Sequence, residues 1–337
     1  MKMLAEKTSP APPSDWQSLC EPIQPFLDEV NGRLHAEAEA FDPQIATFVR
    51  YALASRGKQL RPMLVALSAR AAGGLTAKHV EAAVIIEMVH LATLVHDDVV
   101  DGAEVRRCRP TLAANWGNKV SVLAGDCLFA EALKLAAGFP SPDVCRMLSQ
   151  TSKVLCTGEI RQTLQRGNFE LSRAEYLEML SMKTAALFAL ACELGARLSN
   201  ADDEATQAAL REYGEQLGTA YQIYDDCVDV FGSEAVAGKS LGTDLATGKA
   251  TLPMLLALEQ ANEQERKSWL ALFKDGEAQA DTVCERLVAA GIPAACREVV
   301  ADMIARAKAA LVNLPGPVEP LHDLADCLTA QLELLDD

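Results

Sequence analysis

The sequence predicts an all-α fold for this chain of 337 residues, on three observations. Ala and Leu dominate the composition, apolar residues recur at spacings of three and four, and β-branched runs are short. The segment "HVEAAVIIEMVHLATLVHDD" is apolar on most of its circumference, which is typical of a helix buried inside a large bundle. Since no stretch alternates in the manner of a strand, we predict a bundle of at least about ten helices.

Glycine and proline clusters mark where the predicted helices end. They fall at "AAGG" (71–74), "GFPSPD" (138–143) and "LPGP" (314–317), and Ser141 and Ser172 are candidate N-caps of the helices that follow. The predicted helices span, in order, residues 15–31, 43–54, 61–72, 76–100, 116–137, 141–166, 172–199, 203–231, 251–275 and 279–336, the last interrupted by Gly and Pro.

The net charge limits what the protein can bind. Lys and Arg minus Asp and Glu give 31 − 47 = −16, and the sequence pI is near 4.8. A chain this acidic lacks the positive surface that nucleic acid or anionic lipid requires. An anionic substrate would therefore need a site with clustered Lys and Arg residues or with bound metal ions.

Cysteine usage and the N-terminal segment point to the cytosol. The ten cysteines form no CxxC pair and no disulfide-scaffold spacing, which predicts reduced, mostly buried thiols. The segment "MKMLAEKTSPAPPSDW" has no apolar region of a signal peptide, and its prolines predict a flexible tail over residues 1–14. No stretch reaches the roughly 18 uncharged apolar residues of a membrane span. We predict a soluble cytoplasmic protein with a single domain over residues 15–337.

A short acidic motif ends the most apolar helix. "HDDVVD" places Asp97, Asp98 and Asp101 at DDxxD spacing, so that all three carboxylates crowd one face of a helix. Such like charges destabilise a bare helix. A single motif of this kind is as often a solvated helix end as a binding site.

A second copy of the motif favours the binding site. "YQIYDDCVDVFG" repeats the spacing at Asp225, Asp226 and Asp229, 225 − 97 = 128 residues later. Two acidic ladders on two buried helices are compatible if they face one another across divalent cations. Mg²⁺ shares its oxygen ligands between carboxylates, water and substrate phosphates. Metal plus phosphate is therefore the first hypothesis.

Basic residues near these motifs supply candidate phosphate ligands, since Arg binds phosphate oxygens bidentately and Lys as a point charge. Any one of them alone is more often a surface charge, but most lie beside a Gly, a Pro or an acidic motif. The candidates are Lys58 and Arg61 in "RGKQLRP", Arg106 and Arg107 in "EVRRCRPT", Lys183 beside Thr184, and Lys239 and Lys249 in "AGKSLGTDLATGKATLP".

With these motifs the chain resembles the trans-isoprenyl (polyprenyl) diphosphate synthases, from about residue 50 to 260. GK-x-x-RP, HDD-x-x-D-x-x-x-x-RR, the KT pair, Q-x-x-DD-x-x-D and GK-x-T all occur in order. The resemblance implies the type I isoprenoid synthase fold, a single large helical bundle with a deep central apolar cavity. It also implies Mg²⁺-dependent head-to-tail condensation of isopentenyl diphosphate with an allylic diphosphate (dimethylallyl, geranyl or farnesyl), usually by a homodimer.

The resemblance assigns roles to individual residues of this chain. Asp97, Asp101 and Asp225 would bind three Mg²⁺ ions, supported by Asp98, Asp226 and Asp229. Isopentenyl diphosphate would be bound by Lys58, Arg61, His90 and Arg107. The allylic diphosphate would be bound by Arg106, Lys183, Thr184, Gln222, Lys239 and Lys249, and among these Lys183, Thr184 and Gln222 would be catalytic, with Thr184 and Gln222 near the carbocation.

The chain departs from the family pattern at three places. It has "RGK" for the usual GGK, Cys108 where the family has the Gly of RRG, and an acidic "LELLDD" where relatives often end with basic residues. The last departure puts a contribution of the C-terminus to the site in doubt. Among other polar residues, we expect His96 to be a structural hydrogen-bonding group and Asp126 a buried polar anchor.

Product length is predicted from the helix that carries the first motif. Ala92 and Thr93 lie one turn before Asp97, and one turn spans about 5.4 Å, comparable to one isoprene unit. Because both residues are small, the channel should continue past them, which favours a long product of roughly 30 to 50 carbons. A side chain such as Phe129 could close the cavity earlier, so geranylgeranyl or farnesyl diphosphate synthase is the alternative, and a regulatory subunit of a heteromeric synthase is a further one.

Overall fold

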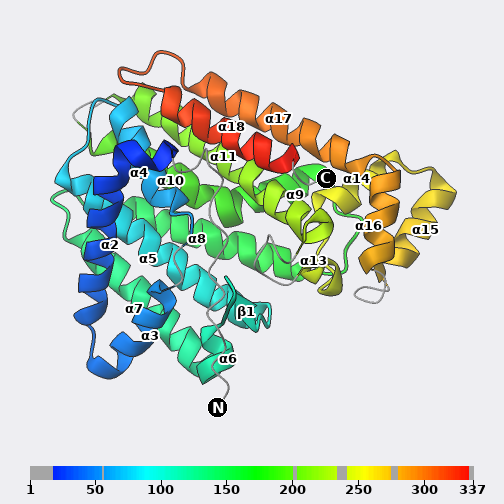
Figure 1. Ribbon diagram of the computed structural model, residues 1–337, viewed down its shortest axis with the longest axis horizontal. Helices are drawn as coiled ribbons and strands as arrows, with labels where there is room; N and C mark the ends of the chain where they lie inside the picture. Colours follow the sequence, from blue (N-terminus) through cyan, green and yellow to red (C-terminus); the bar gives the residue numbers. More distant parts are fainter. Residues whose placement is uncertain (1–17, 55–56, 200–202, 234–240, 275–279, 334–337) are drawn as a thin grey trace.

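The computed structural model describes residues 18–54, 57–199, 203–233, 241–274 and 280–333, and it is almost entirely helical there (Figure 1). Its helices are η1 (Glu21–Ile23), α2 (Gln24–Glu39), α3 (Pro43–Leu53), α4 (Leu60–Ala71), α5 (Ala77–Val100), α6 (Leu112–Trp116), α7 (Asn118–Ala137), α8 (Asp143–Leu164), α9 (Arg173–Leu180), the π-helix η2 (Ser181–Ala185), α10 (Ala186–Arg197), α11 (Glu204–Phe231), α13 (Thr243–Ala246), α14 (Leu252–Gln260), α15 (Glu263–Lys274), α16 (Ala280–Ala289), α17 (Ile292–Ala310) and α18 (Glu319–Glu333). The all-α prediction is confirmed.

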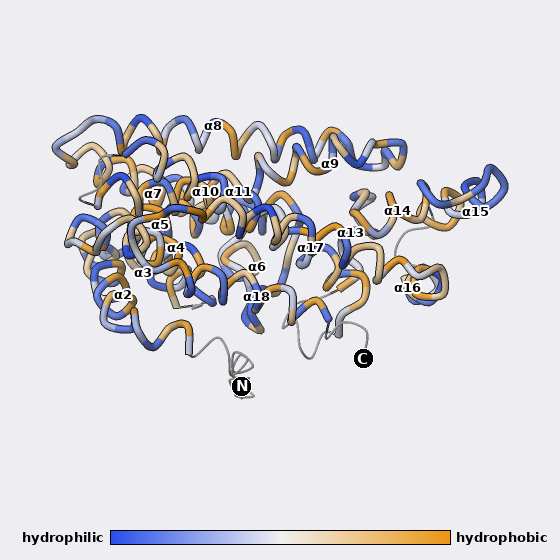
Figure 2. The backbone as a smooth tube through the Cα atoms, turned by 90° about the horizontal axis from the view of Figure 1, so that it is seen from above, coloured by the Kyte–Doolittle hydropathy of each residue, from blue (hydrophilic) through white to orange (hydrophobic). Residues whose placement is uncertain are grey.

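Helix α10 lies at the centre of the bundle. It packs against α4 and α11, while α5 packs against α7 and α11 against α17. Figure 1 shows α17 and α18 running together along one side of the molecule, and Figure 2 shows α8 and α9 along one edge. Because most residues of α10 and α5 are apolar and buried, these helices form the core that positions the two acidic motifs.

Two glycines of α11 permit a close approach between α11 and the segment before it. A Cβ on Gly218 would lie 2.7 Å from Ala185 Cα, and one on Gly214 would lie 2.7 Å from the Phe188 carbonyl oxygen. Neither contact is possible for a larger residue without backbone movement. Glycine therefore lets α11, which carries the second acidic motif, pack directly on η2 and α10.

The predicted single helix over 172–199 is interrupted. It divides into α9, the π-helix η2 and α10, with the KT pair inside η2. Such π-turns insert an extra residue into a helix and occur frequently at functional sites. Ser172 is confirmed as N-cap, with a capping box to Glu175. For α8 the N-cap is Pro142 rather than the predicted Ser141. The Ser141 hydroxyl nevertheless accepts a bond from the amide of Asp143, the first residue of α8.

Several predicted helix boundaries were wrong. Helix α2 continues to Glu39, eight residues beyond its predicted end at 31, and the predicted helix 251–275 is two helices that divide near Asn262. The Asn262 side chain accepts bonds from the first amides of α15, so it begins a new helix there. A hairpin of β1 (Val105–Arg106) and β2 (Arg109–Pro110) was missed because two residues are too few to alternate.

Two composition-based predictions concern membrane spans and cysteines. The segment Arg173–Arg197 is long and apolar enough to cross a membrane by length and composition, and 72% of its most apolar window is buried inside the bundle. None of the ten cysteines, all of which lie in the described residues, forms a disulfide, but Cys192, Cys227 and Cys296 alone are buried, so "mostly buried" was wrong. The predicted tail lies outside the described residues, and the single domain over 15–337 stays a prediction.

Candidate active site

The first acidic motif lies at the C-terminal end of α5. The amide of Asp101 still donates to the Asp97 carbonyl (2.8 Å), so the helical spacing of the carboxylates is retained. Asp98 is buried and accepts a 2.6 Å bond from Nε of Arg106 on the hairpin. Asp101 accepts a 2.7 Å bond from Arg166, which lies in the turn after α8. Two of the three carboxylates are thus paired with guanidinium groups.

The carboxyl group of Asp97 has the most strongly shifted pKa of this motif. Burial raises its pKa to about 6; the positive charge of Lys183 opposes this, while Glu159 and Asp101 add to it. Burial also raises the pKa of Asp98, against the opposing effect of Arg106. A carboxylate that is desolvated and crowded by other acids gains most from a nearby cation.

The hairpin that holds Arg106 has a strained turn. Its two central residues, Arg107 and Cys108, have φ angles of 50° and 60°. A two-residue turn with positive φ at both positions strongly favours Gly or Asn. The family's RRG pattern therefore has a physical reason, and Cys108 takes the left-handed conformation at some energetic cost.

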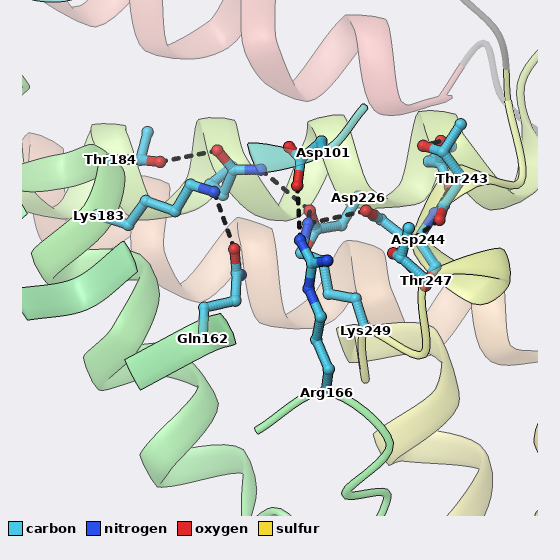
Figure 3. A network of polar contacts seen from close by, with 12 residues as sticks. Asp101, Gln162, Arg166, Lys183, Thr184, Asp226, Thr243, Asp244, Thr247 and Lys249 are labelled. Atoms are coloured by element: carbon cyan, nitrogen blue, oxygen red, sulfur yellow. Dashed lines mark hydrogen bonds and ion pairs between the residues drawn. The ribbon is translucent and has the colours of Figure 1, made fainter. Parts of the chain in front are cut away.

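The second acidic motif is locked into a network (Figure 3). The buried Asp226 accepts bonds from Tyr176 Oη (2.7 Å), Gln222 Nε2 (3.0 Å) and Lys249 Nζ (3.2 Å). Burial acts to lower the pKa of Lys249, but the carboxylates of Asp226 and Asp244 outweigh it and raise that pKa well above its usual value. Lys249 also bonds Asp244 at 2.9 Å.

The third carboxylate of this motif organises the loop that follows. Asp229 accepts from the Thr243 hydroxyl and from the Asp244 amide, each at 3.0 Å. The first carboxylate, Asp225, lies near Lys58 and Tyr221. Burial lowers the pKa of Lys58, and the charge of Asp225 opposes this. Burial raises the pKa of Tyr221 to about 12, and Asp225 adds to this. Lys239 lies outside the described residues.

The predicted catalytic residues are brought together between the motifs. Lys183 in η2 contacts Gln162 (2.9 Å) and Glu159 (2.6 Å) of α8. The Thr184 hydroxyl donates to Gln222 Oε1 at 2.8 Å, and the Gln222 amide in turn donates to Asp226, so both ends of the amide are fixed (Figure 3). The network runs without a break from η2 to the second acidic motif.

The predicted isopentenyl diphosphate residues form a partly buried basic group. Burial lowers the pKa of Arg61 to about 10, and the charge of Glu87 opposes this. Burial and the nearby arginines hold the pKa of His90 well below its usual value. Arg61 lies over the Phe188 ring (4.7 Å), and its Nε is buried with no hydrogen-bond partner among the described residues. Buried donors of this kind are normally satisfied, which suits an anionic ligand.

Glycine and the C-terminal helix complete this group. A Cβ on Gly57 would lie 2.4 Å from Nη2 of Arg107, so only glycine leaves room for that guanidinium group. Lys58 donates to Gln331 of α18 at 3.0 Å, beside a cavity of about 20 Å³. The C-terminal helix therefore does reach the site, although its last residues are acidic.

Sequence reasoning missed several residues of the site. Glu87 precedes His90 by one helical turn, so the 3.6-residue period could have identified it. Tyr176 and Arg166 carry no such local signal, because each meets its partner only through tertiary packing. Asp244 lies five residues before its partner Lys249, and that local spacing could have identified it. His96 is confirmed as a structural group that contacts the Val122 carbonyl (3.1 Å). Asp126 is not a buried anchor, since its side chain is 61% exposed.

The residues proposed to set product length, Ala92 and Thr93, lie on α5 one turn before Asp97. Ala92 is buried, and Thr93 is partly buried with its hydroxyl bonded to the His90 carbonyl at 2.8 Å. Phe129 on α7 packs partly buried against the core. The deep central cavity stays a prediction.

Comparison with known proteins decides the family. The model of the polyprenyl synthetase family matches residues 42–290. The chain belongs to this family. It is a prenyltransferase, and the solved structures of polyprenyl synthases share its all-α fold, as the resemblance implied.

Relatives in the family include enzymes of different product length. The octaprenyl diphosphate synthase of Haemophilus influenzae is 36% identical over 72% of this chain and 73% of the relative. The geranylgeranyl diphosphate synthase of Mycobacterium tuberculosis is 37% identical over 85% of each chain. The structure of a Caulobacter crescentus polyprenyl synthase complexed with calcium and isoprenyl diphosphate has a TM-score of 0.88 and 36% identity, covering 95% of this chain and 99% of that one.

The residues of the site fit the divalent cation on which this family generally depends. Among the described residues, no group of three or more acidic, His or Cys side chains is gathered closely enough to hold a metal unaided. Mg²⁺ in phosphate-binding enzymes usually takes one or two carboxylates and completes its shell with water and substrate phosphates. Carboxylates divided between α5 and α11 suit a metal that is shared with a diphosphate.

Proposed function

We propose that this prenyltransferase is a Mg²⁺-dependent long-chain trans-polyprenyl diphosphate synthase that condenses an allylic diphosphate with isopentenyl diphosphate. The observation that carries this proposal is the continuous network from Thr184 through Gln222 to Asp226, which joins the KT pair to the second acidic motif. An arrangement of this kind orients groups for a reaction between two bound substrates.

The carboxylates are proposed to hold the metal ions. Asp97, Asp101 and Asp225 would be the ligands of three Mg²⁺ ions, and Asp98, Asp226 and Asp229, which are buried and accept bonds from protein donors, would support them. When bound, these ions supply charge neutralisation that weakens the C–O bond of the allylic diphosphate. The engaged carboxylates keep the helix ends and the loop after α11 in place.

The basic residues are proposed to divide between the two diphosphates. Lys58, Arg61, His90 and Arg107 would bind isopentenyl diphosphate, supported by the buried Nε of Arg61, which has no hydrogen-bond partner among the described residues. Arg106, Lys183, Lys239 and Lys249 would bind the allylic diphosphate. Glu87 would keep the guanidinium groups of Arg61 and Arg107 together, since it attracts both.

Thr184 and Gln222 are proposed to face the cationic carbon. The Gln222 amide is held at both ends, so its oxygen dipole has a fixed direction and loses little energy to reorientation. The surrounding side chains of α10, such as Phe188 and Leu187, are apolar and buried and would exclude water that could quench a cation. The departing diphosphate would accept the lost proton, so no dedicated protein base is required.

Product length is proposed to be set along α5. Ala92 and Thr93 are small and lie one turn below Asp97, and Val89, Met88 and Ile85, which lie further along α5, are buried and apolar. We therefore expect a product of roughly 30 to 50 carbons, at about one isoprene unit per helical turn. Relatives include both octaprenyl and geranylgeranyl diphosphate synthases, so a shorter product of about 20 carbons is the second candidate.

One experiment tests the function and the length together. Pure protein is incubated with Mg²⁺, farnesyl diphosphate and isopentenyl diphosphate, and the products are sized by chromatography. We expect products of about 30 carbons or more from the wild type and about 15 to 20 from Ala92→Phe, since the new ring closes the cavity one turn below the motif. Leu94→Phe is the control, because position 94 lies two residues after Ala92 and so on the opposite side of α5. Its products should have the wild-type length. Equal products from wild type and Ala92→Phe would show that α5 does not set the length.

The protein is further proposed to be a cytoplasmic homodimer. Helices α7 and α8 expose large apolar side chains: Leu123 is 63%, Ile160 60% and Leu164 78% exposed. Exposed apolar side chains on neighbouring helices are typical of an interface. Light scattering on the purified protein should give twice the mass of the 36.2 kDa chain.

A further inference from the structure

Arg166 is a basic residue that none of the proposed roles uses. It lies in the turn that follows α8, and its Nη2 donates to Oδ1 of Asp101 at 2.7 Å. Asp101 is one of the three carboxylates proposed to bind metal, whereas Arg106 and Lys249 pair with the supporting carboxylates Asp98 and Asp226. A cation of the protein therefore sits on a proposed metal ligand.

The position of Arg166 is fixed by its neighbours rather than by Asp101. The amide of Gly167 donates to the Gly248 carbonyl at 2.7 Å, which joins this turn to the loop that carries Lys249. Both glycines have positive φ (78° and 70°), and a Cβ on Gly248 would lie 3.1 Å from the Gly167 nitrogen. The turn thus holds Arg166 beside the acidic motifs (Figure 3), even when its guanidinium group has no bond to Asp101.

The bond between Arg166 and Asp101 is weak enough to be exchanged. The two side chains are 32% and 41% exposed, so water screens the pair. Exposed ion pairs contribute little net stability. By contrast, Asp98 is only 7% exposed in its pair with Arg106, and Asp226 only 1% in its pair with Lys249. A divalent cation has twice the charge of a guanidinium group and can replace it most easily at Asp101.

We propose that Arg166 is a displaceable counter-ion of the first acidic motif, which pairs with Asp101 as the structure shows and gives way when a divalent cation binds that carboxylate. This inference rests on the proposed function, because it takes Asp101 as a metal ligand. Arg166 then acts as a positioning residue: it limits repulsion among the carboxylates of α5 and sets how tightly the metal binds.

The test is calorimetric titration of the full-length protein with Mg²⁺ in saturating inorganic pyrophosphate, which supplies the phosphate oxygens that complete the shell of the metal. A titration of pyrophosphate without protein is subtracted. Arg166→Gln removes the competing charge and should tighten Mg²⁺ binding about fivefold, the effect of one unit charge at about 4 Å in water. Arg166→Lys keeps the charge and should stay near the wild-type affinity. The matched control is Arg173→Gln, since Arg173 pairs with Glu259 at similar exposure, 43% and 39%, but with no carboxylate of either motif.

Asp101→Asn separates the two possible failures. One outcome is that Asp101→Asn weakens Mg²⁺ binding while Arg166→Gln binds Mg²⁺ no more tightly than Arg173→Gln does. In that case Arg166 is not displaced by the metal, and Asp101 remains a metal ligand. If Asp101→Asn binds Mg²⁺ like the wild type, the metal assignment in the proposed function is wrong and the exchange falls with it. Tighter binding in Arg166→Gln alone, with weaker binding in Asp101→Asn, supports both.

Discussion

The two acidic motifs share one spacing but differ in how the protein holds them. In the second motif, Asp226 and Asp229 are locked by donors from Tyr176, Gln222, Lys249 and the loop after α11. In the first motif, Asp98 and Asp101 accept bonds from arginines of a two-residue hairpin and of a turn, and Lys183 lies near Asp97. The comparison teaches that two motifs of the same spacing can have different roles. The second motif is a rigid frame, and the first is adjustable.

The largest expected effect on turnover comes from removing the first carboxylate of either motif. Asp97→Ala or Asp225→Ala should lower turnover at least about a thousandfold, because a metal ligand contributes several kcal/mol to the reaction. Unfolding of Asp97→Ala should occur at the wild-type temperature or above it, since the change removes a buried acid whose pKa burial has raised. Steady-state kinetics and circular dichroism measure the two. Near-normal turnover in either variant would rule out two metal-binding motifs.

An intermediate effect should distinguish the rigid frame from the adjustable motif. Tyr176→Phe removes one of three donors to the buried Asp226 and should destabilise the protein by about 1–3 kcal/mol. Because Asp226 also holds Gln222, kcat should fall roughly tenfold, which corresponds to about 1.4 kcal/mol of misplaced hydrogen bonding.

The control for this variant is Tyr213→Phe. Tyr213 is also fully buried, and its hydroxyl donates to the Leu321 carbonyl at 2.7 Å, away from both motifs. It should lose stability but keep kcat. Chemical denaturation and steady-state kinetics on both variants give the comparison, and equal kcat in the two would show that Tyr176 has only a structural part.

The smallest effect concerns the hairpin beside the first motif. Cys108→Gly should stabilise the protein by about 0.5–1 kcal/mol, because glycine adopts the φ of 60° without the clash of a Cβ. The turn should keep Arg106 in place, so kcat/KM should not change. Thermal unfolding measures the gain, and an unfolding temperature below that of the wild type would mean that the Cys108 side chain contributes more than its backbone strain removes.

The sequence by itself determined the helices and the acidic motifs, because both depend on local spacing. The 3.6-residue period identified α5 and α11, and DDxxD on that period placed three carboxylates on one face of each. The same period placed the small residues Ala92 and Thr93 one turn before Asp97 on α5. It could not reveal the π-helix at the KT pair, which depends on packing against α8 and α11.

Only the tertiary structure decided which side chains meet across the site. Arg166 contacts Asp101 from 65 positions away, Tyr176 contacts Asp226 from 50, and Lys58 reaches Gln331 from 273. A periodic pattern describes one helix and carries no information about the partner at such a separation. These contacts follow from how the helices pack, and they make one acidic motif rigid while leaving the other free to exchange its cation.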